Sequence, residues 1–375
     1  MSRTLSLRLH RLLLPLACCL LTVFAILLPA SQANERSSAP AGMETIELPA
    51  NAKPDGMVIN AAMLVKNIYA VDLASESFLA DGWYWLSWGD DVQAALNKNN
   101  IKPSDIVELS NEIEIGQYSA SEAIEENANI APEDKYSYYA KFSGKFFISN
   151  VSQRLAPFDK QTIGISLEVK PHALSLPPDQ ISLIPISIEK QPIAGEFSDI
   201  NGFILTDTHW SRQVARYVSS LRASDSQAKP HEEFSRLTAT FTYTPNLLTV
   251  FLKWLLPIIV VMGIVILAPS INGALGDVRL AIPSAALLTL VVLQDAYKTN
   301  FPPAPYLTYL DELYTYSYLV CIVIFILFLI GTNAHSSASE SDRDLITERV
   351  NRLDLIVQCA TVAGFLLVAI VGWYT

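Results

Sequence analysis

The chain has 375 residues, of which 51% are hydrophobic and 17% charged, and its formal net charge is −11. This negative charge argues against nucleic acid and anionic membrane surfaces as partners, because both attract basic proteins. The length allows two or three domains, and the mean hydropathy is too high for an ordinary soluble chain. The apolar excess lies in separate segments, which indicates a membrane protein.

Residues 1–33 have the composition of a secretory signal peptide. Three arginines precede an apolar core at residues 12–28, and Ser31 and Ala33 follow as small residues. This order is typical of a signal that is cleaved on export. We therefore expect cleavage after Ala33 and an N-terminal domain outside the cytoplasm.

Residues 34–245 predict an exported β-sandwich of the Ig-like kind. Short runs rich in β-branched and aromatic residues alternate with turn-forming segments, as in sandwich domains. The expected strands cover residues 58–73, 82–88, 136–148, 161–169, 181–188 and 237–243, with one short helix at 90–99. The four cysteines (Cys18, Cys19, Cys321 and Cys359) all lie outside this domain, so we expect no disulfide in it.

Residues 246–375 predict a transmembrane domain of four helices. Each of four apolar segments approaches the roughly 20 residues that a helix needs to cross a bilayer. They cover about 247–268, 278–297, 314–330 and 353–374. The linker between the last two holds Arg343, Arg349 and Arg352, which the positive-inside rule places in the cytoplasm. We expect a multi-pass protein of the inner membrane, with its N-terminal domain and C-terminus periplasmic or extracellular.

The second apolar segment carries a stripe with an acid at its start and another near its end. Steps of three or four residues connect the members of this stripe, which are Asp277, Ala281, Ala285, Leu288, Val292, Asp295 and Thr299. Such steps place all seven side chains on one face of an α-helix. Acids in membrane helices usually face a protein interior or a water-filled path. The pattern fits a pore wall, and it fits equally a lipid-facing helix with charged ends.

Several short motifs occur in a definite order along the chain. They are LAPFDKQ at 155–161, TNFPPAPYLTY at 299–309, YTPN at 243–246 before a span that contains Pro257, and a strand at 82–88 followed by two aspartates. The first resembles the Pro-Phe-Asp-x-Gln loop of the pentameric ligand-gated ion channels (the Cys-loop receptor superfamily), and the second resembles the loop after their pore helix. The chain thus resembles the cysteine-free prokaryotic form of this family over almost the whole mature length.

The chain departs from the family pattern at two places. Thr238 stands where the family often has an arginine near the end of the last strand, and Arg236 lies two residues earlier. The sequence therefore does not predict the ion pair of Asp159 with an arginine at that position. Pro283 lies in the first turns of the predicted pore helix, although proline is tolerated near a helix start.

The resemblance implies a homopentamer in a lipid bilayer, with five copies of the second span around a pore. Asp277 and Asp295 would then form an inner and an outer carboxylate ring, which favour cations. An arginine facing the lumen would favour anions instead. Arg279 lies about 200° round the helix from Asp277, so we expect it to face protein or cytosol.

The resemblance also implies roles in gating. Leu288 and Val292 would form an apolar gate, which stops ions by dewetting, while Ala281, Ala285 and Thr299 would line the pore. Coupling to the exported domain would bring one loop (Pro157, Phe158 and Asp159) against the 300–309 loop, which prolines stiffen (Pro302, Pro303 and Pro305) and which includes Tyr306. The alternative is a static interface.

The family's ligand site lies between subunits, under a hairpin that corresponds here to about 222–233. The candidate residues are Tyr118, Trp210, Arg216 and Tyr217. Aromatic side chains bind cationic ligands, but the aromatic candidates fit equally well as residues of the apolar core. The ligand is expected to be an unknown small molecule or ion. No cofactor is expected to be required, but the acid-rich segment that includes Glu108, Glu112 and Glu114 is a candidate Ca²⁺ site. Its alternative is a solvated acidic loop. His172, His209 and His231 would allow proton sensing.

Other functions are less well matched. The sequence has no nucleophile elbow, zinc-protease motif, P-loop or metal-spaced Cys/His set, so we expect no enzyme. A membrane-anchored extracellular ligand-binding or sensor protein without ion conduction remains the main alternative, although the largest inside segment is only 333–351. A transporter tends to show repeated halves and broken helices, which the sequence lacks.

Overall fold

The structure is a computed structural model of one chain. It describes residues 43–49, 52–54, 56–114, 119–120, 124–126, 131–148, 153–170, 180–186, 191–197, 200, 202–218, 231–272, 275–301, 304, 306–339 and 343–374. The predicted signal peptide lies outside these residues. The described residues form two compact units, one within Arg36–Val151 and Lys160–Asn246 and the other within Ser152–Asp159 and Leu247–Thr375.

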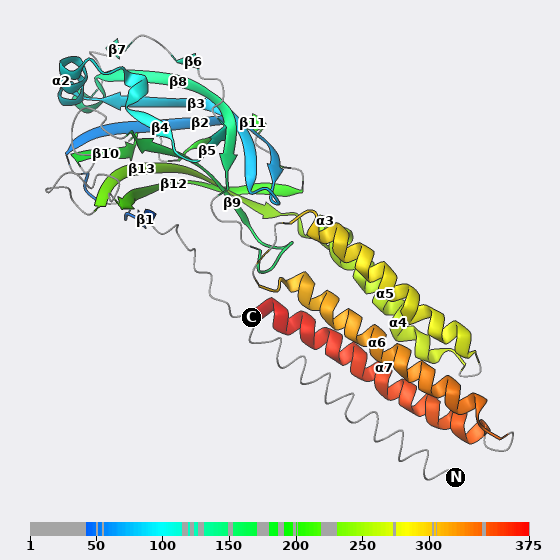
Figure 1. Cartoon of the computed structure of the whole chain (residues 1–375). Coiled ribbons are helices and arrows are strands. Elements are labelled where there is room, and N and C mark those ends of the chain that lie inside the picture. The colour runs from blue at the N-terminus through cyan, green and yellow to red at the C-terminus, as the bar shows by residue number, and fades with distance from the viewer. Residues whose placement is uncertain are drawn as a thin grey trace. The chain divides into compact units, whose positions relative to one another are not determined.

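The first unit consists of two curled β-sheets (Figure 1). The five-stranded sheet has the order β1 (Met43–Glu47), β12 (Phe203–Val218), β13 (His231–Pro245), β9 (Gln161–Val169) and β4 (Val107–Leu109). The main path of the other sheet is β10 (Ile181–Pro185), β2 (Met57–Asp72), β3 (Ser77–Trp88), β8 (Tyr136–Phe147) and β5 (Glu112–Glu114). Three short strands complete it: β11 (Ile193–Phe197) pairs with β2, and β6 (Ser119–Ala120) and β7 (Glu125–Glu126) pair with β8.

One apolar core is shared by both sheets. On β9, Ile163, Ile165 and Leu167 are fully buried, as the period-2 alternation of a strand requires. They belong to the same cluster as Phe142 and Trp88 of the other sheet. The arrangement is compatible with the expected sandwich, and about 200 residues suffice for such a core without disulfides.

Most expected elements of this unit are present. Helix α2 covers Asp90–Asn99 and strand β9 covers Gln161–Val169, both as predicted. Strand β13 is longer than expected, because it begins at His231. The apolar pattern did not predict strand β12, since polar residues such as Asp207 and Gln213 interrupt it. The hairpin that the family resemblance implies at about 222–233 did require a strand containing Arg216 and Tyr217. Strand β12 is held by a long antiparallel pairing with β13.

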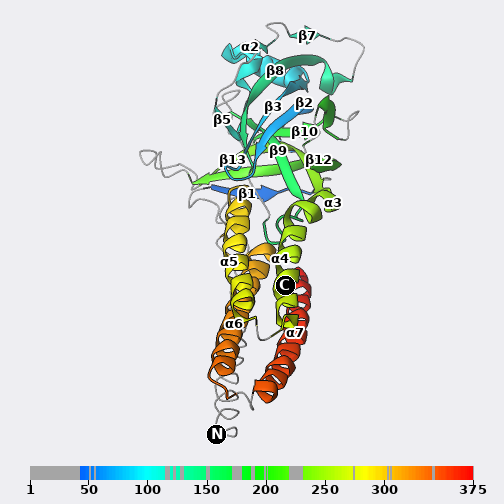
Figure 2. The ribbon, with the colours of Figure 1, turned by 90° about the vertical axis from the view of Figure 1, so that its right-hand side faces the viewer.

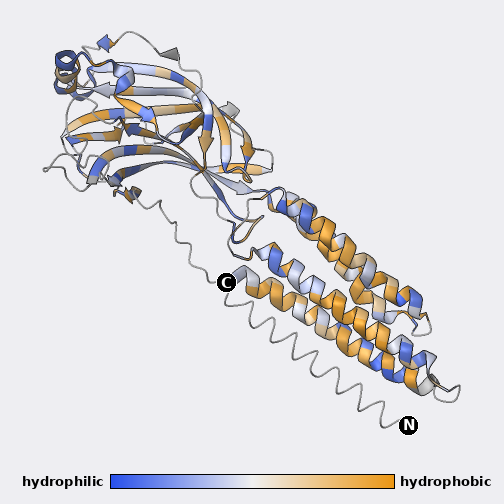
Figure 3. Ribbon diagram, in the orientation of Figure 1, coloured by the Kyte–Doolittle hydropathy of each residue, from blue (hydrophilic) through white to orange (hydrophobic). Residues whose placement is uncertain are grey.

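The second unit contains four helices that are long and apolar enough to cross a membrane. They are Leu247–Ser270, which joins α3 (Leu247–Val250), one π-helical turn and α4 (Leu256–Leu267); α5 (Gly276–Lys298); α6 (Tyr309–Ser336); and Ile346–Tyr374 within α7 (Arg343–Tyr374). Figure 3 shows the apolar residues that run along these helices. The chain is thus a multi-pass membrane protein by the length and composition of its helices.

Neighbouring helices form a bundle in which α5 packs against α4 and α6, and α7 packs against α6 and α4 (Figure 2). Helix α6 begins five residues earlier than its predicted span. The reason is a capping box, in which Thr308 accepts a hydrogen bond from the backbone N–H of Asp311 and the Asp311 carboxylate accepts from Thr308. Polar caps extend a helix beyond the apolar segment that marks it in the sequence.

Candidate functional site

The seven residues of the acid-ended stripe are all exposed: six lie on one face of α5, and Thr299 follows its last residue. Leu288 is 70% exposed and Val292 61% exposed, although both are large and apolar. Asp277, Asp295 and the three smaller members, Ala281, Ala285 and Thr299, are also exposed. The stripe is therefore not used to pack this helix against the other helices of its own chain.

The opposite face of α5 is the packed one. Its buried residues are Gly276, Arg279, Pro283, Ala286, Leu290 and Tyr297. At about 100° per residue, the centre of this set lies roughly 175° from the centre of the stripe. Pro283 removes one N–H from the helix on this face, and the helix nevertheless continues to Lys298. One helix thus has two distinct faces, and the stripe is the one left uncovered.

The exposed face of α5 differs from those of its neighbours. Exposed positions on α4 and α7 are mainly large and apolar, for example Val260 and Leu366, as contact with lipid requires. The α5 segment is the least apolar of the four spans. Its exposed Ser284 and Thr289 donate hydrogen bonds to backbone carbonyls one turn earlier, both at 2.9 Å, so their hydroxyls need no water. Within the stripe, contact with lipid would cost the most free energy at the two acids, Asp277 and Asp295.

Arg279 points into the bundle and is only 3% exposed. Its guanidinium donates a hydrogen bond to the carboxylate of Asp354 on α7, which is equally buried. The guanidinium carbon also lies 4.1 Å from the centre of the Phe328 ring on α6, a cation–π contact. The expectation that Arg279 faces protein is confirmed. This base is therefore paired inside the bundle and does not contribute its charge to the exposed stripe.

The loop of residues 153–159 packs on one end of the helices. The Phe158 ring lies 5.9 Å from Tyr309 at the start of α6 and 5.4 Å from Trp373 at the end of α7. Tyr309 and Trp373 lie 5.8 Å apart, so the three rings form a closed triangle of edge-to-face contacts. The Arg154 carbonyl accepts a 2.9 Å hydrogen bond from the Tyr309 N–H. The loop is therefore tied to both α6 and α7.

Other members of the predicted coupling loops are placed only in part. Pro157 is buried and Asp159 half-buried within the same loop. Tyr306 is half-buried, whereas Pro302, Pro303 and Pro305 lie outside the described residues. Phe158 thus contacts Tyr309, the last residue of the 300–309 loop that was predicted to meet it. The described residues include little of the proline-rich middle of that loop.

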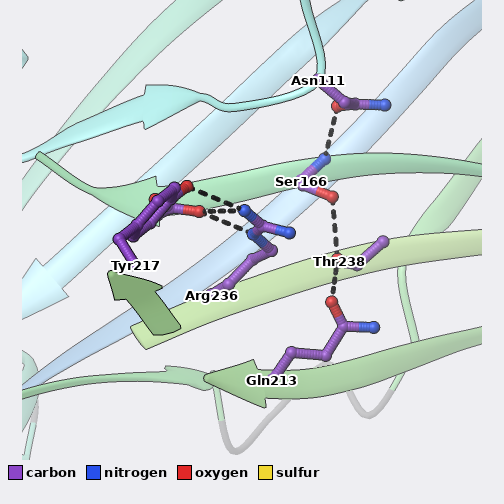
Figure 4. A network of polar contacts seen from close by, with 7 residues as sticks. Asn111, Ser166, Gln213, Tyr217, Arg236 and Thr238 are labelled. Carbon is purple, nitrogen blue, oxygen red and sulfur yellow. Dashed lines mark hydrogen bonds and ion pairs between the residues drawn. The ribbon is translucent and has the colours of Figure 1, made fainter. Parts of the chain in front are cut away.

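Among the described candidate ligand residues, Trp210, Arg216 and Tyr217 each have partners within the chain. The Tyr217 hydroxyl donates to Glu168 at 2.8 Å and accepts from Arg236 at 3.2 Å, while Arg236 donates to Glu168 at 2.6 Å (Figure 4). Burial raises the pKa of Tyr217 to about 12, with a further contribution from the Glu168 carboxylate. Tyr217 thus serves a polar network on the five-stranded sheet, and Arg236 has Glu168 as its partner.

The remaining candidates occupy separate places. Arg216 pairs with Glu233 and Glu44, and Trp210 packs against the apolar core. Tyr118 lies outside the described residues. Beside the Tyr217 network, Ser166 connects Asn111 and Thr238 in a second chain of hydrogen bonds (Figure 4).

The calcium prediction receives no support from the described residues, which contain no group of three or more His, Cys, Asp or Glu side chains that could hold a metal ion. The side chain of Glu114 lies outside the description. The same is true of His172 and of the side chain of His231. The exposed His209 lies 2.8 Å from Asp207, its neighbour on β12.

The sequence patterns did not single out Asp354 or Trp373, whereas Tyr309 is the last residue of the 300–309 loop that was predicted to meet Phe158. A signal for Asp354 was available, since an acid in one apolar segment and a base in another predict a buried pair. The family resemblance predicts the contact of Phe158 with the 300–309 loop, whereas nothing in the sequence indicates that Trp373 joins it.

No protein-family model matches the chain, and no curated protein matches it at a significant level.

Proposed function

We propose that this chain is the subunit of a homopentameric, ligand-gated and cation-selective ion channel. One observation carries the proposal: an acid-ended helical stripe is exposed along its whole length, on the face directly opposite the one that α5 buries in its own bundle. A face that contains two acids needs water or protein beside it within a membrane. Five copies of α5 around an axis supply both.

Cation selectivity is proposed to come from Asp277 and Asp295. Five carboxylates at each end of the pore would concentrate cations and repel anions. The pairing of Arg279 with Asp354 supports the role of Asp277, because it removes the base nearest to that acid from the stripe. The exposed Lys298 lies one turn after Asp295 and remains near the other acid. Asp277 also lies in the first turn of α5, where the helix dipole favours an acid regardless of function.

The gate is proposed to be formed by Leu288 and Val292. Both side chains are more than 60% exposed in the single chain. Exposing large apolar side chains to water costs free energy, whereas five copies in a ring would exclude water from the pore at this level. Ala281, Ala285 and Thr299 would line the rest of the path. The Phe158 loop is proposed to transmit movement to α6 and α7 through its ring contacts.

In this proposal the first unit and the C-terminus lie on the periplasmic or extracellular side of the inner membrane, and an unknown small molecule or ion opens the channel. The main alternative is a membrane-anchored sensor without conduction. A channel subunit and a sensor of this sequence would have the same number of membrane spans, so a topology experiment does not distinguish them.

Recording from the purified protein in planar bilayers tests the proposal. Discrete stepwise currents are expected from a channel and none from a sensor. The Asp277→Asn variant should lower the cation-to-anion permeability ratio. Currents whose ratio is the same in wild type and variant would exclude Asp277 as a selectivity residue.

A further inference from the structure

Strand β1 forms one edge of the five-stranded sheet, beside β12 (Figure 1). Its five residues pair antiparallel with residues 213–217 of β12 in an unbroken register. None of the five belongs to the apolar core that the described parts of the two sheets share. Strand β1 is thus held mainly by its pairing with β12, and elements with few buried apolar contacts open at a low cost in free energy.

The main chain of β1 bonds to β12 at every second residue. The Leu48 N–H donates to the Arg212 carbonyl at 2.8 Å, and in an antiparallel ladder the groups that face the partner strand recur two residues apart. The N–H groups of Ile46 and Glu44 therefore face β12, whereas the N–H of Thr45 points away from it. This alternation decides where a proline can be placed without breaking the ladder.

One ion pair adds to the pairing of the main chains. Glu44, Arg216 and Glu233 stand opposite one another on three neighbouring strands. The Arg216 guanidinium lies 3.1 Å from Glu44 and 2.8 Å from Glu233. The Glu44 side chain is 63% exposed, and pairs with such exposure contribute little. Release of β1 would leave Arg216 paired with Glu233, so no unpaired charge would result.

The chain that follows β1 is attached separately. The Arg212 side chain donates a 2.6 Å hydrogen bond to the Ala52 carbonyl. Gly56 lies directly against the main chain of Gln180, where a Cβ would collide. Loss of residues 43–47 from β12 would therefore leave the chain attached from Ala52 onward.

We propose that the edge of β12 is a binding site for an extended peptide segment of another protein, and that β1 is its removable internal occupant. A strand edge offers main-chain donors and acceptors to an added extended segment. The resident strand shows the chemistry that fits, which is an apolar residue opposite Val214 and an acid opposite Arg216. The proposal concerns the first unit alone and does not depend on ion conduction.

The test uses a fluorescein-labelled peptide of residues 42–49 and the purified full-length protein in detergent. Because β1 is tethered to its site, its effective concentration there is on the order of 1 mM. A strand that stays paired at this concentration must have a Kd below about 1 mM as a free peptide, and the peptide should not displace it from wild type at lower concentrations.

The Ile46→Pro variant lacks a ladder N–H, which should release β1. Fluorescence anisotropy should then show saturable peptide binding with a Kd below about 1 mM. The matched control is Thr45→Pro, in which the lost N–H points away from β12. This variant should keep β1 in place and, like wild type, bind no peptide.

Two proline peptides test whether the main-chain ladder carries the binding. With the Ile46→Pro protein, the Thr45→Pro peptide should bind as the unmodified peptide does. The Ile46→Pro peptide should bind at least about fivefold more weakly, which is the effect of one lost hydrogen bond. Equal binding of the two proline peptides would overturn the proposal, as would the absence of saturable binding to the Ile46→Pro protein.

Two further outcomes would also overturn it. Equal peptide binding to wild type and to the Ile46→Pro protein would place the peptide on the free outer edge of β1. An Ile46→Pro protein that fails to fold would show that β1 is a required part of the sheet and not a removable occupant.

Discussion

The guanidinium of Arg279 on α5 donates a hydrogen bond to the carboxylate of Asp354 on α7, and the two side chains are each 4% exposed. Helices α5 and α7 are each packed against α4 and α6, so this ion pair connects two helices that are not the main packing partners of each other. Nε of Arg279 and Oδ1 of Asp354 have no further hydrogen-bond partner among the described residues. The stability of the pair therefore depends on one hydrogen bond and on the Phe328 ring.

Breaking this pair should destabilise the bundle. Asp354→Asn leaves an uncompensated buried cation, which costs about 3–5 kcal/mol in comparable buried pairs. The double variant Arg279→Met with Asp354→Leu should recover most of the loss, because apolar residues of similar volume replace both charges. Thermal unfolding in detergent measures the stability of the single and the double variant. A single variant that melts at the wild-type temperature would contradict the burial argument.

Leu288→Thr should make channel opening easier. A hydroxyl in the narrow apolar ring favours water in the pore and so weakens the dewetting barrier. Single-channel recording should show a higher open probability, including openings without added ligand. The control is Leu366→Thr, which places the same change at an exposed site of α7. If both variants behave as wild type, Leu288 is not part of the gate.

Phe158 and Trp373 should be energetically coupled. Edge-to-face aromatic pairs contribute about 0.5–1.5 kcal/mol beyond their buried area. A double-mutant cycle with Phe158→Leu and Trp373→Leu, measured by unfolding, should give a coupling energy of this size. Trp254 packs on Tyr297 and Phe301 instead, so Phe158→Leu with Trp254→Leu should be additive within about 0.5 kcal/mol. Additivity of the first pair would remove the basis for transmission through this contact.

Glu108→Gln should stabilise the first unit at neutral pH. Glu108 is exposed on β4. Partial desolvation still raises its pKa, the neighbouring Glu168 carboxylate raises it further, and Lys170 partly opposes both. Because solvent screens an exposed charge, the stability change should be small. A raised folded-state pKa means that the stabilising contribution of the protonated carboxyl is lost as the pH rises through that pKa. The variant should therefore melt higher than wild type at pH 7.

This advantage should disappear near pH 3.5, below the ordinary glutamate pKa of about 4.3, where wild type is protonated as well. Glu47→Gln, on the exposed end of β1, serves as the control and should show the same small change at both pH values. An equal gain for Glu108→Gln at both pH values would contradict the electrostatic cause.

Much of the fold could be predicted from local patterns. The alternation in 161–169 and the polar, helix-forming segment 90–99 each specify one element, and both are found at the predicted bounds. Local pattern did not predict strand β12, because its stability comes from pairing with β13; only the hairpin implied by the family resemblance required a strand there. The start of α6 was missed because a polar capping box lies outside the apolar segment.

The sequence by itself determined the four apolar helices, the β-rich unit before them and the helical face shared by Asp277, Leu288 and Asp295, because period and composition act over a few neighbouring residues. Only the tertiary structure decided which face of α5 is buried, where Arg279 finds its partner and that Trp373 joins the contact of Phe158 with Tyr309. These relationships join residues far apart in the chain, and long-range packing sets them.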